Sequence, residues 1–457
     1  MFTYFNSKNG DLNEAFRIAI GDLTGNIVPF RDGLLEEKKP CVLAGLDYDS
    51  PWTRDTAINV WNGVGLLYPD VAKNTLTSIL EKNRNVRIIG GQYWDKIIWV
   101  VGAWQYILMT GDLAFMETVY EAVSTTLSVM EQEEFDEKKG LFRGPAVYGD
   151  GVAAYPDKYA ENDFVPSGIL DWPRLHLEQK AGKGFGIPMC ALSTNCVYYE
   201  AYRICAAMTK LLNMDDSGWK EKADQLKNQI NRYFWNNEKG SYRYLVDDTN
   251  CDHQEGLGLA FTLLFDIADQ HQTESILKNT VITEHGIACV WPSFSRYINK
   301  GGYGRHSGVI WPHVQGFWAA AVRKANDYKL FEKEFWSLTK LALASKQFAE
   351  IYHPETGVMY GGLQEDGGTG IREWKSCNRQ TWSATAYLSM IIYGLFGMEF
   401  TWNGVWLKPH LPEGIDEMEL IVPYRKATLH IEVSRNTAGE KKRFIPAETV
   451  GDIKVEL

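Results

Sequence analysis

The chain has 457 residues, of which 45 % are hydrophobic, 23 % charged and 13 % aromatic, and its formal net charge is −11. These fractions are typical of globular proteins and exclude disordered, collagen-like and disulfide-dense classes. The acidic balance also argues against a nucleic-acid partner held by phosphate neutralisation, which needs clustered Lys and Arg. The longest apolar stretch, 386–398, is too short to span a membrane, so no membrane partner is expected.

Seven scattered cysteines form no Cys-x-x-Cys pair, and the nine histidines show no zinc-binding spacing. We therefore expect free, buried thiols, with no metal and no cofactor. The N-terminus lacks a basic region followed by an apolar core, so the sequence predicts no signal peptide and a cytoplasmic location.

Helical periodicity dominates the chain to about residue 398 and predicts twelve helices. The second helix of a pair tends to carry a charged face, as in 220–232, whereas the first is often apolar nearly all round, as in 309–322. Because a helix without a polar face is buried on all sides, this alternation indicates an inner ring wrapped by an outer ring. The predicted helices span 11–29, 55–67, 70–84, 95–110, 113–135, 191–213, 216–236, 254–267, 270–279, 311–326, 328–347 and 380–396.

After about residue 400 the pattern changes to an apolar and polar alternation with a period of two. It predicts strands at 405–407, 418–422 and 429–433. These strands are too few to hold a core alone, so they are expected to pack on the helices. The sequence thus predicts a helical domain over 1–399 and a small β-rich appendage over 400–457.

Long connections between the helix pairs are rich in Gly, Pro, Trp and acidic residues. Loops of this length inside a compact domain are usually functional. A helical scaffold with long loops on one face is a common way to build a cleft. The connections span 30–54, 136–190, 237–253, 280–310 and 348–379.

Two of these connections carry candidate carboxylates beside tryptophan. Arg54 and Asp55 fall at a helix N-terminus, which favours a carboxylate; a helix cap with an ion pair would explain them equally well. Asp171 stands next to Trp172 in an apolar stretch, where desolvation raises a carboxyl pKa towards general-acid use. The alternative for Asp171 is a turn residue before Pro173.

Two later connections add a basic and an acidic candidate. Arg305, His306 and Trp311 are interpreted as cleft-lining residues, whereas a structural role inside the helix is at least as plausible for His313. Glu350 falls at the end of a helix, where the helix dipole disfavours negative charge, and this hints at a compensating use. Two carboxylates on separate loops amid tryptophans fit the chemistry of glycosidic bonds.

Several segments resemble those of the (α/α)6-barrel, or six-hairpin, glycosidases, particularly glycoside hydrolase family 63 and the glucoamylases. The segment Pro-Trp-Thr-Arg-Asp-Thr-Ala at 51–57 resembles the family segment that binds the sugar of the −1 subsite. The segment Ser-Gly-Ile-Leu-Asp-Trp-Pro-Arg at 167–174 resembles the general-acid loop of family 63 and trehalases. The segment at 307–312 resembles the Arg-Gly-Pro-x-Trp segment of family 63, with Ser307 in place of the Arg, whose contact Arg305 could supply.

The closest match is Glu-x-Tyr-x-Pro-x-Thr-Gly at 350–357, followed by Trp-Ser-Ala from Trp382, which resembles the general-base segment of family 63 and glucoamylases. The tail from 404 to 412 resembles the C-terminal β domain of related rhamnosidases and sugar phosphorylases. The resemblance implies an all-α fold, an (α/α)6 barrel of twelve helices with a small C-terminal β appendage.

The residues and the resemblance together predict an inverting glycoside hydrolase that acts on an α-linked glycoside or short oligosaccharide. In this hypothesis Asp171 protonates the departing oxygen and Glu350 activates water. A small carbohydrate is the expected partner. The predicted substrate-binding residues are Trp52, Arg54, Asp55, Trp94, Asp95, Trp172, Arg174, Arg305, His306, Trp311 and Trp382.

Two alternatives stay open at the level of sequence. A sugar phosphorylase of similar fold would use phosphate instead of water and would need a cationic pocket, for which Arg305 and His306 are candidates. A non-catalytic carbohydrate-binding barrel would keep the tryptophans and the Arg54–Asp55 pair but would need neither Asp171 nor Glu350.

Overall fold

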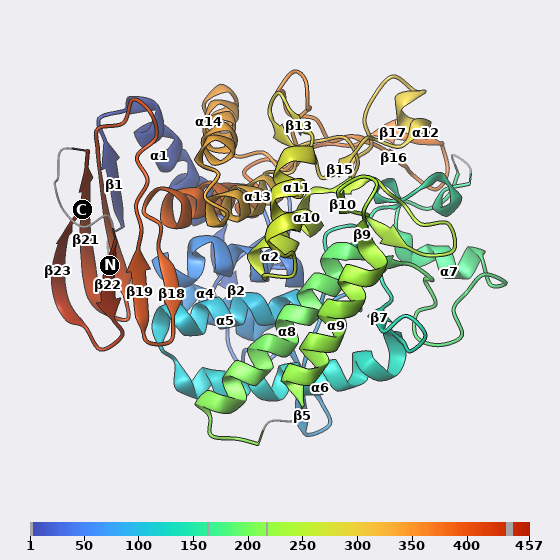
Figure 1. The fold of residues 1–457 in the computed structure, drawn as a ribbon, viewed down its shortest axis with the longest axis horizontal. Coiled ribbons are helices and arrows are strands. Elements are labelled where there is room, and N and C mark those ends of the chain that lie inside the picture. Colours follow the sequence, from blue (N-terminus) through green and yellow to red (C-terminus); the bar gives the residue numbers. More distant parts are fainter. Residues whose placement is uncertain (1–2, 162–163, 216–217, 436–441) are drawn as a thin grey trace.

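Six inner helices form a closed ring in the computed structural model, which describes residues 3–161, 164–215, 218–435 and 442–457 (Figure 1). Each inner helix packs on the next, and the last packs on the first. The inner ring consists of α2 (Thr53–Asn59) with its continuations η1 (Val60–Val64) and α3 (Gly65–Leu67), α5 (Ile98–Thr110), α8 (Leu192–Leu211), α10 (Gly256–Leu264), α13 (Pro312–Lys324), and α15 (Thr381–Ser389) with its continuation η5 (Met390–Leu395).

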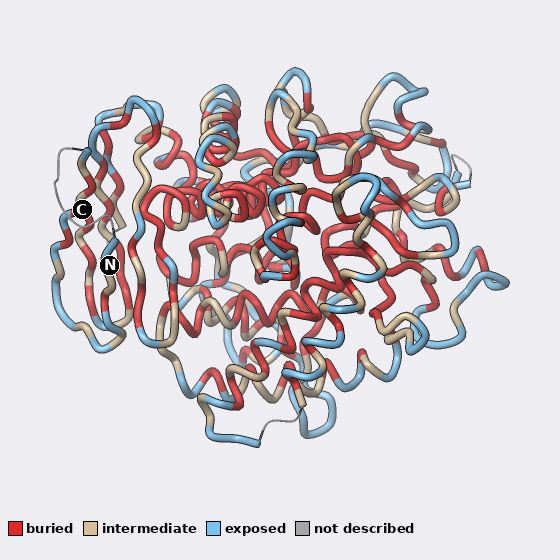
Figure 2. Tube along the Cα trace, in the orientation of Figure 1, coloured by how far each residue is buried: buried red, intermediate tan, exposed pale blue. Residues whose placement is uncertain are grey.

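Six amphipathic helices wrap this ring and complete the twelve that the sequence predicts. The outer helices are α1 (Gly10–Gly25), α4 (Pro69–Ile79), α6 (Leu113–Glu134), α9 (Trp219–Phe234), α11 (Gln270–Asn279) and α14 (Tyr328–Ser345). Every residue of α15 is buried, whereas α9 buries only a stripe that repeats every three or four residues from Trp219 to Phe234. Figure 2 shows the resulting contrast between buried inner and partly exposed outer helices. This difference is the one that the apolar and amphipathic sequence patterns predict.

Local capping chemistry sets several helix ends. The Asp112 side chain accepts from the Phe115 N–H at the start of α6, and Asp327 does the same for Leu330 at the start of α14. α11 begins with a capping box in which Asp269 and Gln272 satisfy each other's backbone N–H groups. These caps fix where the chain turns between paired helices.

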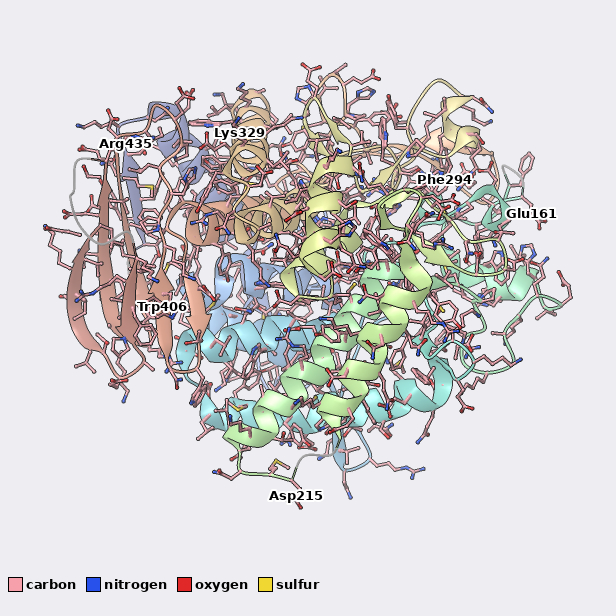
Figure 3. The ribbon with its side chains drawn as sticks, in the orientation of Figure 1. Glu161, Asp215, Phe294, Lys329, Trp406 and Arg435 are labelled. Atoms are coloured by element: carbon pink, nitrogen blue, oxygen red, sulfur yellow. The ribbon has the colours of Figure 1, made fainter. Side chains whose placement is uncertain are left out.

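The C-terminal region forms two sheets that pack at one end of the barrel, at the left of Figure 1. One sheet has the order β1 (Tyr4–Ser7), β20 (Glu417–Tyr424), β21 (Lys426–Ser434) and β23 (Val450–Glu456), and the other has the order β18 (Glu399–Thr401), β19 (Gly404–Leu407) and β22 (Arg443–Pro446). The predicted strands fall within β19, β20 and β21. In Figure 3 the labelled Trp406 and Arg435 lie at this end, opposite Phe294 and Glu161.

Strand β1 pairs antiparallel with β20, with Tyr4 opposite Ile421. Strand β1, near the start of the chain, therefore belongs to the same sheet as β23, near its end, although four residues are too few to show a periodic pattern in the sequence. The predicted domain boundary at residue 399 stays a prediction. One strand of the C-terminal sheet, β1, precedes this boundary in the chain.

The class predicted from sequence, all-α, describes the barrel but not the connections, which contain short strand pairs. The residues of a connection can form a β-hairpin even where the sequence shows no alternation of apolar and polar residues. The short strands are β2 (Ile27–Phe30), β3 (Lys39–Val42), β4 (Leu80–Asn83), β5 (Val86–Ile89), β6 (Phe135–Asp136), β7 (Leu141–Phe142), β8 (Cys190–Ala191), β9 (Trp235–Asn236), β10 (Ser241–Tyr242), β11 (Leu245–Val246), β12 (Gln254–Glu255), β13 (Ile282–Thr283), β14 (Gly286–Ile287), β15 (Val290–Trp291), β16 (Leu363–Glu365) and β17 (Ile371–Glu373). Short helical turns are η2 (Val152–Ala154), η3 (Asp157–Tyr159), η4 (Ile169–Asp171), α7 (Trp172–Leu175) and α12 (Ser295–Ile298).

All seven cysteines are buried and none forms a disulfide, as the sequence predicts. Among the described residues, no helix combines the length and the apolar character needed to cross a bilayer.

The inner helices approach each other closely where glycine faces a neighbour. A Cβ on Gly102 of α5 would lie 2.6 Å from the carbonyl oxygen of Ala57 and 2.7 Å from its Cα. We predict that Gly102→Ala lowers the free energy of unfolding by about 1–3 kcal/mol, because the extra methyl group pushes α2 and α5 apart. Urea unfolding measures this change.

Gly21→Ala is the matched control, because Gly21 is exposed on α1 and a Cβ there would meet nothing within 4 Å. This variant is expected to keep its stability or to gain up to about 1 kcal/mol. Equal effects of the two substitutions would contradict the close packing of α2 on α5.

Candidate active site

A cavity of about 250 Å³ opens at the N-terminal ends of the inner helices. Trp52, Trp311 and Gln380 immediately precede α2, α13 and α15, and the long connections supply the remaining walls. The lining residues are Tyr48, Trp52, Arg54, Asp55, Tyr148, Asp150, Gly151, Ser167, Gly168, Arg305, His306, Trp311, Glu350, Gln364, Trp374, Gln380 and Trp382. The segments that the sequence singles out around residues 52, 306 and 350 thus meet in one cavity.

Glu350 is the most fully hydrogen-bonded acidic side chain of this cavity. One of its oxygens accepts from the Tyr48 hydroxyl at 2.8 Å, and the other accepts from Arg305 Nη2 at 2.8 Å and from the backbone N–H of Cys377 at 3.1 Å. The residue is only 1 % exposed. Three donors therefore compensate the charge of a carboxylate that is almost removed from solvent.

The chain reaches Glu350 through a loop fixed at several points. α14 ends at Ser345, and Lys346 follows in a left-handed conformation with φ 57°. The Phe348 N–H then donates to Asp22, and the Glu350 N–H donates to the carbonyl of Cys377. Glu350 thus lies beyond the last turn of α14, on a loop whose backbone is already ordered.

Arg54, in the first turn of α2, connects three parts of the site. Its Nη1 donates to Asp95 at 3.0 Å and to Gln92 at 2.6 Å, and its Nη2 donates to Asp150 at 3.0 Å. The Asp150 carboxylate also lies 3.4 Å from His306 Nε2. Burial acts to raise the pKa of Asp150, but Arg54 and His306 outweigh it and hold that pKa below its ordinary value.

Asp55 has the opposite electrostatic environment. Burial raises the pKa of this carboxyl to about 8, although Arg54 opposes the rise, and Glu350 and Asp150 add to it. Gln380 Nε2 donates to Asp55 at 3.3 Å. Near pH 7 the cavity therefore presents a protonated Asp55 beside an ionised Asp150, so it offers both donors and acceptors to a ligand.

Aromatic side chains form the floor and the rim of the cavity. Trp311 and Trp382 are almost buried and meet edge to face at 5.6 Å, with the His313 ring stacked on Trp382 at 4.1 Å. Trp52 is 45 % exposed and its backbone is left-handed with φ 50°. A strained backbone that presents an exposed aromatic ring to a cavity is typical of a binding site.

The sequence profile of the mannosylglycerate hydrolase MGH1-like glycoside hydrolase domain matches residues 97–383, more than half of the chain. The chain belongs to this family. Its fold is that of glycosidase barrels, as comparison with solved structures shows. No curated protein sequence matches the chain.

Three solved structures illustrate this likeness. A sialidase has a TM-score of 0.69 at 14 % identity, over 98 % of this chain and 40 % of its own. The GH78 rhamnosidase of Bacillus sp. GL1 has a TM-score of 0.61 at 14 % identity, over 100 % and 44 %. The GH63 mannosylglycerate hydrolase of Thermus thermophilus, in complex with glucose, has a TM-score of 0.59 at 13 % identity, over 82 % and 99 %. The chain therefore spans less than half of the first two proteins and nearly the whole of the third.

Asp171, the predicted acid of this MGH1-like domain, lies beside the cavity and not among its lining residues. It ends the short turn η4, its side chain is 40 % exposed, and it accepts from Arg174 Nη1 at 3.2 Å. Its Oδ2 lies 3.8 Å from the position of a Cβ on Gly168, which does line the cavity. The carboxylate thus lies next to the wall that Ser167 and Gly168 form.

Four other predicted residues lie behind the cavity or outside it. Asp95 is buried behind Arg54, from which it accepts, and does not line the cavity. Trp94 is fully buried and donates from Nε1 to the carbonyl of Ala146, as a core residue does. Trp172 is buried against His176 and does not face the cavity. The Arg174 side chain is 82 % exposed and touches the site only through Asp171.

Sequence reasoning missed several residues that line the cavity, namely Tyr48, Tyr148, Asp150, Gln364 and Gln380. A signal for Asp150 existed, because it stands between two glycines in the longest connection. Glycines have no side chains that could cover a neighbouring acidic group. Tyr48 and Gln380 gave no such signal, since each matters only through a partner more than 300 residues away.

Several buried polar atoms of the cavity have no hydrogen-bond partner among the described residues. Such groups are rare in folded proteins and mark places where a ligand or water completes the bonding. They are Arg54 Nε, His306 Nδ1, Gln364 Oε1, Gln380 Oε1 and Trp382 Nε1. Their mixture of donors and acceptors suits a ligand rich in hydroxyl groups.

Asp55 makes the stability of the fold depend on pH. Because its pKa is about 8 in the folded chain and near 4 when unfolded, the folded state binds more protons between these values. Stability contributed by Asp55 is therefore present at low pH and falls as pH rises towards 8. We predict that Asp55→Asn makes this fall shallower by up to about 1.4 kcal/mol per pH unit.

Denaturant unfolding of the wild type and the variant from pH 4 to pH 8 measures the two slopes. A variant whose slope equals that of the wild type would contradict the protonation of Asp55 in the folded state.

Proposed function

We propose that the chain is an inverting glycoside hydrolase in which Glu350 is the general base and Asp171 the general acid. The observation that carries the proposal is the position of Glu350, a buried carboxylate in a cavity of polar and aromatic residues. Membership of a glycoside hydrolase family supports the same reaction class. The substrate is an α-linked glycoside or short oligosaccharide whose terminal sugar enters the cavity.

Glu350 takes a proton from a water molecule, and the oxygen of that water forms a bond to the anomeric carbon. The bond from this carbon to the glycosidic oxygen breaks at the same time, and Asp171 gives its proton to the departing oxygen. Water attacks the face opposite the leaving group, so the configuration at the anomeric carbon inverts. Tyr48 and Arg305 hold Glu350 in one orientation throughout.

Asp171 suits the acid role better than Asp150 does. Arg54 and His306 keep Asp150 in its charged form, which can accept from sugar hydroxyls but has no proton to give. Within the part of the chain that the structure describes, Asp171 pairs with the exposed Arg174, and such exposed pairs contribute little. The Asp171 side chain is 40 % exposed and lies next to Gly168, which lines the cavity.

The bonds of Arg305 favour hydrolysis over phosphorolysis. Its guanidinium donates to Glu350 and to the carbonyls of Gly361 and Lys375. The neighbouring His306 has a pKa below its ordinary value, chiefly because it is buried, so it is neutral near pH 7. Neither residue offers the uncommitted positive charge that a phosphate nucleophile requires.

Hydrolysis of a panel of α-glucosides, α-mannosides and α-rhamnosides, followed by proton NMR, tests the reaction and its stereochemistry. The expected first product is the β-anomer, and Glu350→Gln is expected to lower kcat by about 10²- to 10⁴-fold, because the amide cannot accept a proton from water. Glu355→Gln is the control, because Glu355 is exposed on the same loop and its carboxylate accepts from the Tyr303 hydroxyl, outside the cavity lining. An α-anomer as first product, or wild-type turnover in Glu350→Gln, would refute the proposal.

The leaving group distinguishes the acid from the other carboxylates. Asp171→Asn is expected to hydrolyse alkyl glycosides about 10²- to 10⁴-fold more slowly, yet to keep near wild-type turnover with the glycosyl fluoride, since fluoride departs without a proton. Asp150→Asn, by contrast, should slow both substrates, because it weakens the hold on the sugar. If the selective loss appeared in Asp150→Asn instead, Asp171 would not be the acid.

A further inference from the structure

A second cavity, of about 500 Å³, opens at the other end of the barrel axis. The first cavity is built on the initial turns of α2, α13 and α15. This one is built mostly on residues beyond the first turns of the inner helices and on β18, which packs against α5. Figure 1 shows these strands at the end of the barrel that is opposite the long connections. All six inner helices contribute: the lining residues are Trp61, Asn62, Val101, Gln105, Glu200, Leu264, Phe265, Phe317, Ala320, Arg323, Lys324, Asn326, Ser389, Tyr393, Gly397, Met398, Glu399, Phe400 and Lys408.

One wall of this cavity, which we name the axial well, is aromatic. The half-buried Trp61 packs on Phe317 with ring centroids 4.6 Å apart and on Phe265 at 6.0 Å. Trp61 and Phe317 belong to two different inner helices, and Phe265 directly follows a third, α10. Aromatic side chains that pack on one another offer an apolar face to a ligand, and they lose little conformational entropy when the ligand binds.

Asn62, the residue next to Trp61, adds a polar side chain to this aromatic wall. Asn62 is 2 % exposed and lines the axial well, and its Nδ2 has no hydrogen-bond partner among the described residues. It lies in the π-helical segment η1, which faces the second π-helical segment, η5, where the Tyr393 hydroxyl donates to the carbonyl of Trp61 at 2.6 Å. Segments of this kind occur frequently at functional sites, and a buried amide without a partner calls for a ligand atom or water.

Most charged groups that line the axial well have a partner of opposite charge. Lys324 pairs with Asp266 and Lys408 with Glu399, both at 2.6 Å, and Glu200 accepts from Arg203 at 3.0 Å. Arg323 donates to the carbonyl of Gly394 and, among the described residues, has no carboxylate partner. Because the other charges are already paired, the well favours a ligand without a strong charge of its own.

We infer that the axial well is a binding site for a neutral monosaccharide or a polyol of similar size. The C–H face of the sugar ring packs on Trp61, and its hydroxyl groups bond to the Asn62 amide and to the accessible side of the Glu200 carboxyl. Burial raises the pKa of Glu200 to about 7, so this group can act as donor or acceptor to a hydroxyl. The inference does not depend on the proposed hydrolysis, since no catalytic residue lies in the well.

Fluorine NMR of the full chain labelled with 5-fluorotryptophan tests the site. D-glucose, D-mannose and L-rhamnose are titrated separately, and the Trp61 resonance is assigned from the Trp61→Phe variant. At least one sugar is expected to shift the Trp61 resonance saturably. The resonances of Trp311 and Trp382 report binding at the other cavity in the same spectra, so the two sites are read independently.

Asn62→Leu keeps the branched shape of the side chain, with a somewhat larger volume, and removes its hydrogen-bonding atoms; it is expected to weaken sugar binding at Trp61 at least tenfold. Glu200→Gln is a second variant, which retains polarity and keeps the test valid if Asn62→Leu does not fold. Asn83→Leu, in the exposed β4–β5 hairpin, is the matched control and should leave the shift unchanged.

Three results would overturn the inference: a Trp61 resonance that moves with none of the three sugars, a shift that grows linearly without saturation, or full binding in both Asn62→Leu and Glu200→Gln. Loss of hydrolysis on every glycoside, with a saturable Trp61 shift retained, would instead refute only the proposed function.

Discussion

The pairing of carboxylates with Arg54 and Arg305 is the constraint on which the site depends. A charge removed from water is strongly destabilising unless a partner and further hydrogen bonds compensate it. Arg54 compensates Asp95 and Asp150, and Arg305 compensates Glu350. Each arginine thereby ties its own segment to others that are distant in the chain, so the same contacts hold the cavity open and hold its loops together.

The ring of inner helices determines at which end of the barrel these contacts form. The helices α2, α13 and α15 begin at one cavity, and residues of the long connections 30–54, 136–190, 280–310 and 348–379 meet there. Residues mostly beyond the first turns of the inner helices form the axial well at the other end, together with β18. One arrangement of helices thus creates two cavities, one rich in paired charges and one lined by both aromatic and polar residues.

Local patterns predicted the helices well because each pattern reflects burial along a single segment. The apolar character of 309–322 and the charged face of 220–232 correspond to α13 and α9, which are an inner and an outer helix. Strand β1 was missed because four residues carry no period. The sequence predicts that Trp94 and Trp172 line the cavity, because it shows that both are tryptophans in or beside loops. It does not show in which direction their rings point.

The sequence by itself determined the twelve helices, the change to strands near residue 400 and the position of Glu350 within a segment similar to known general-base segments. Only the tertiary structure decided which side chains share the cavity. Tyr48 and Asp150 became part of the site through bonds to Glu350 and Arg54, at separations of 302 and 96 residues. The physical reason is that periodicity and capping are local, whereas charge compensation and ring closure join residues that no pattern along the chain connects.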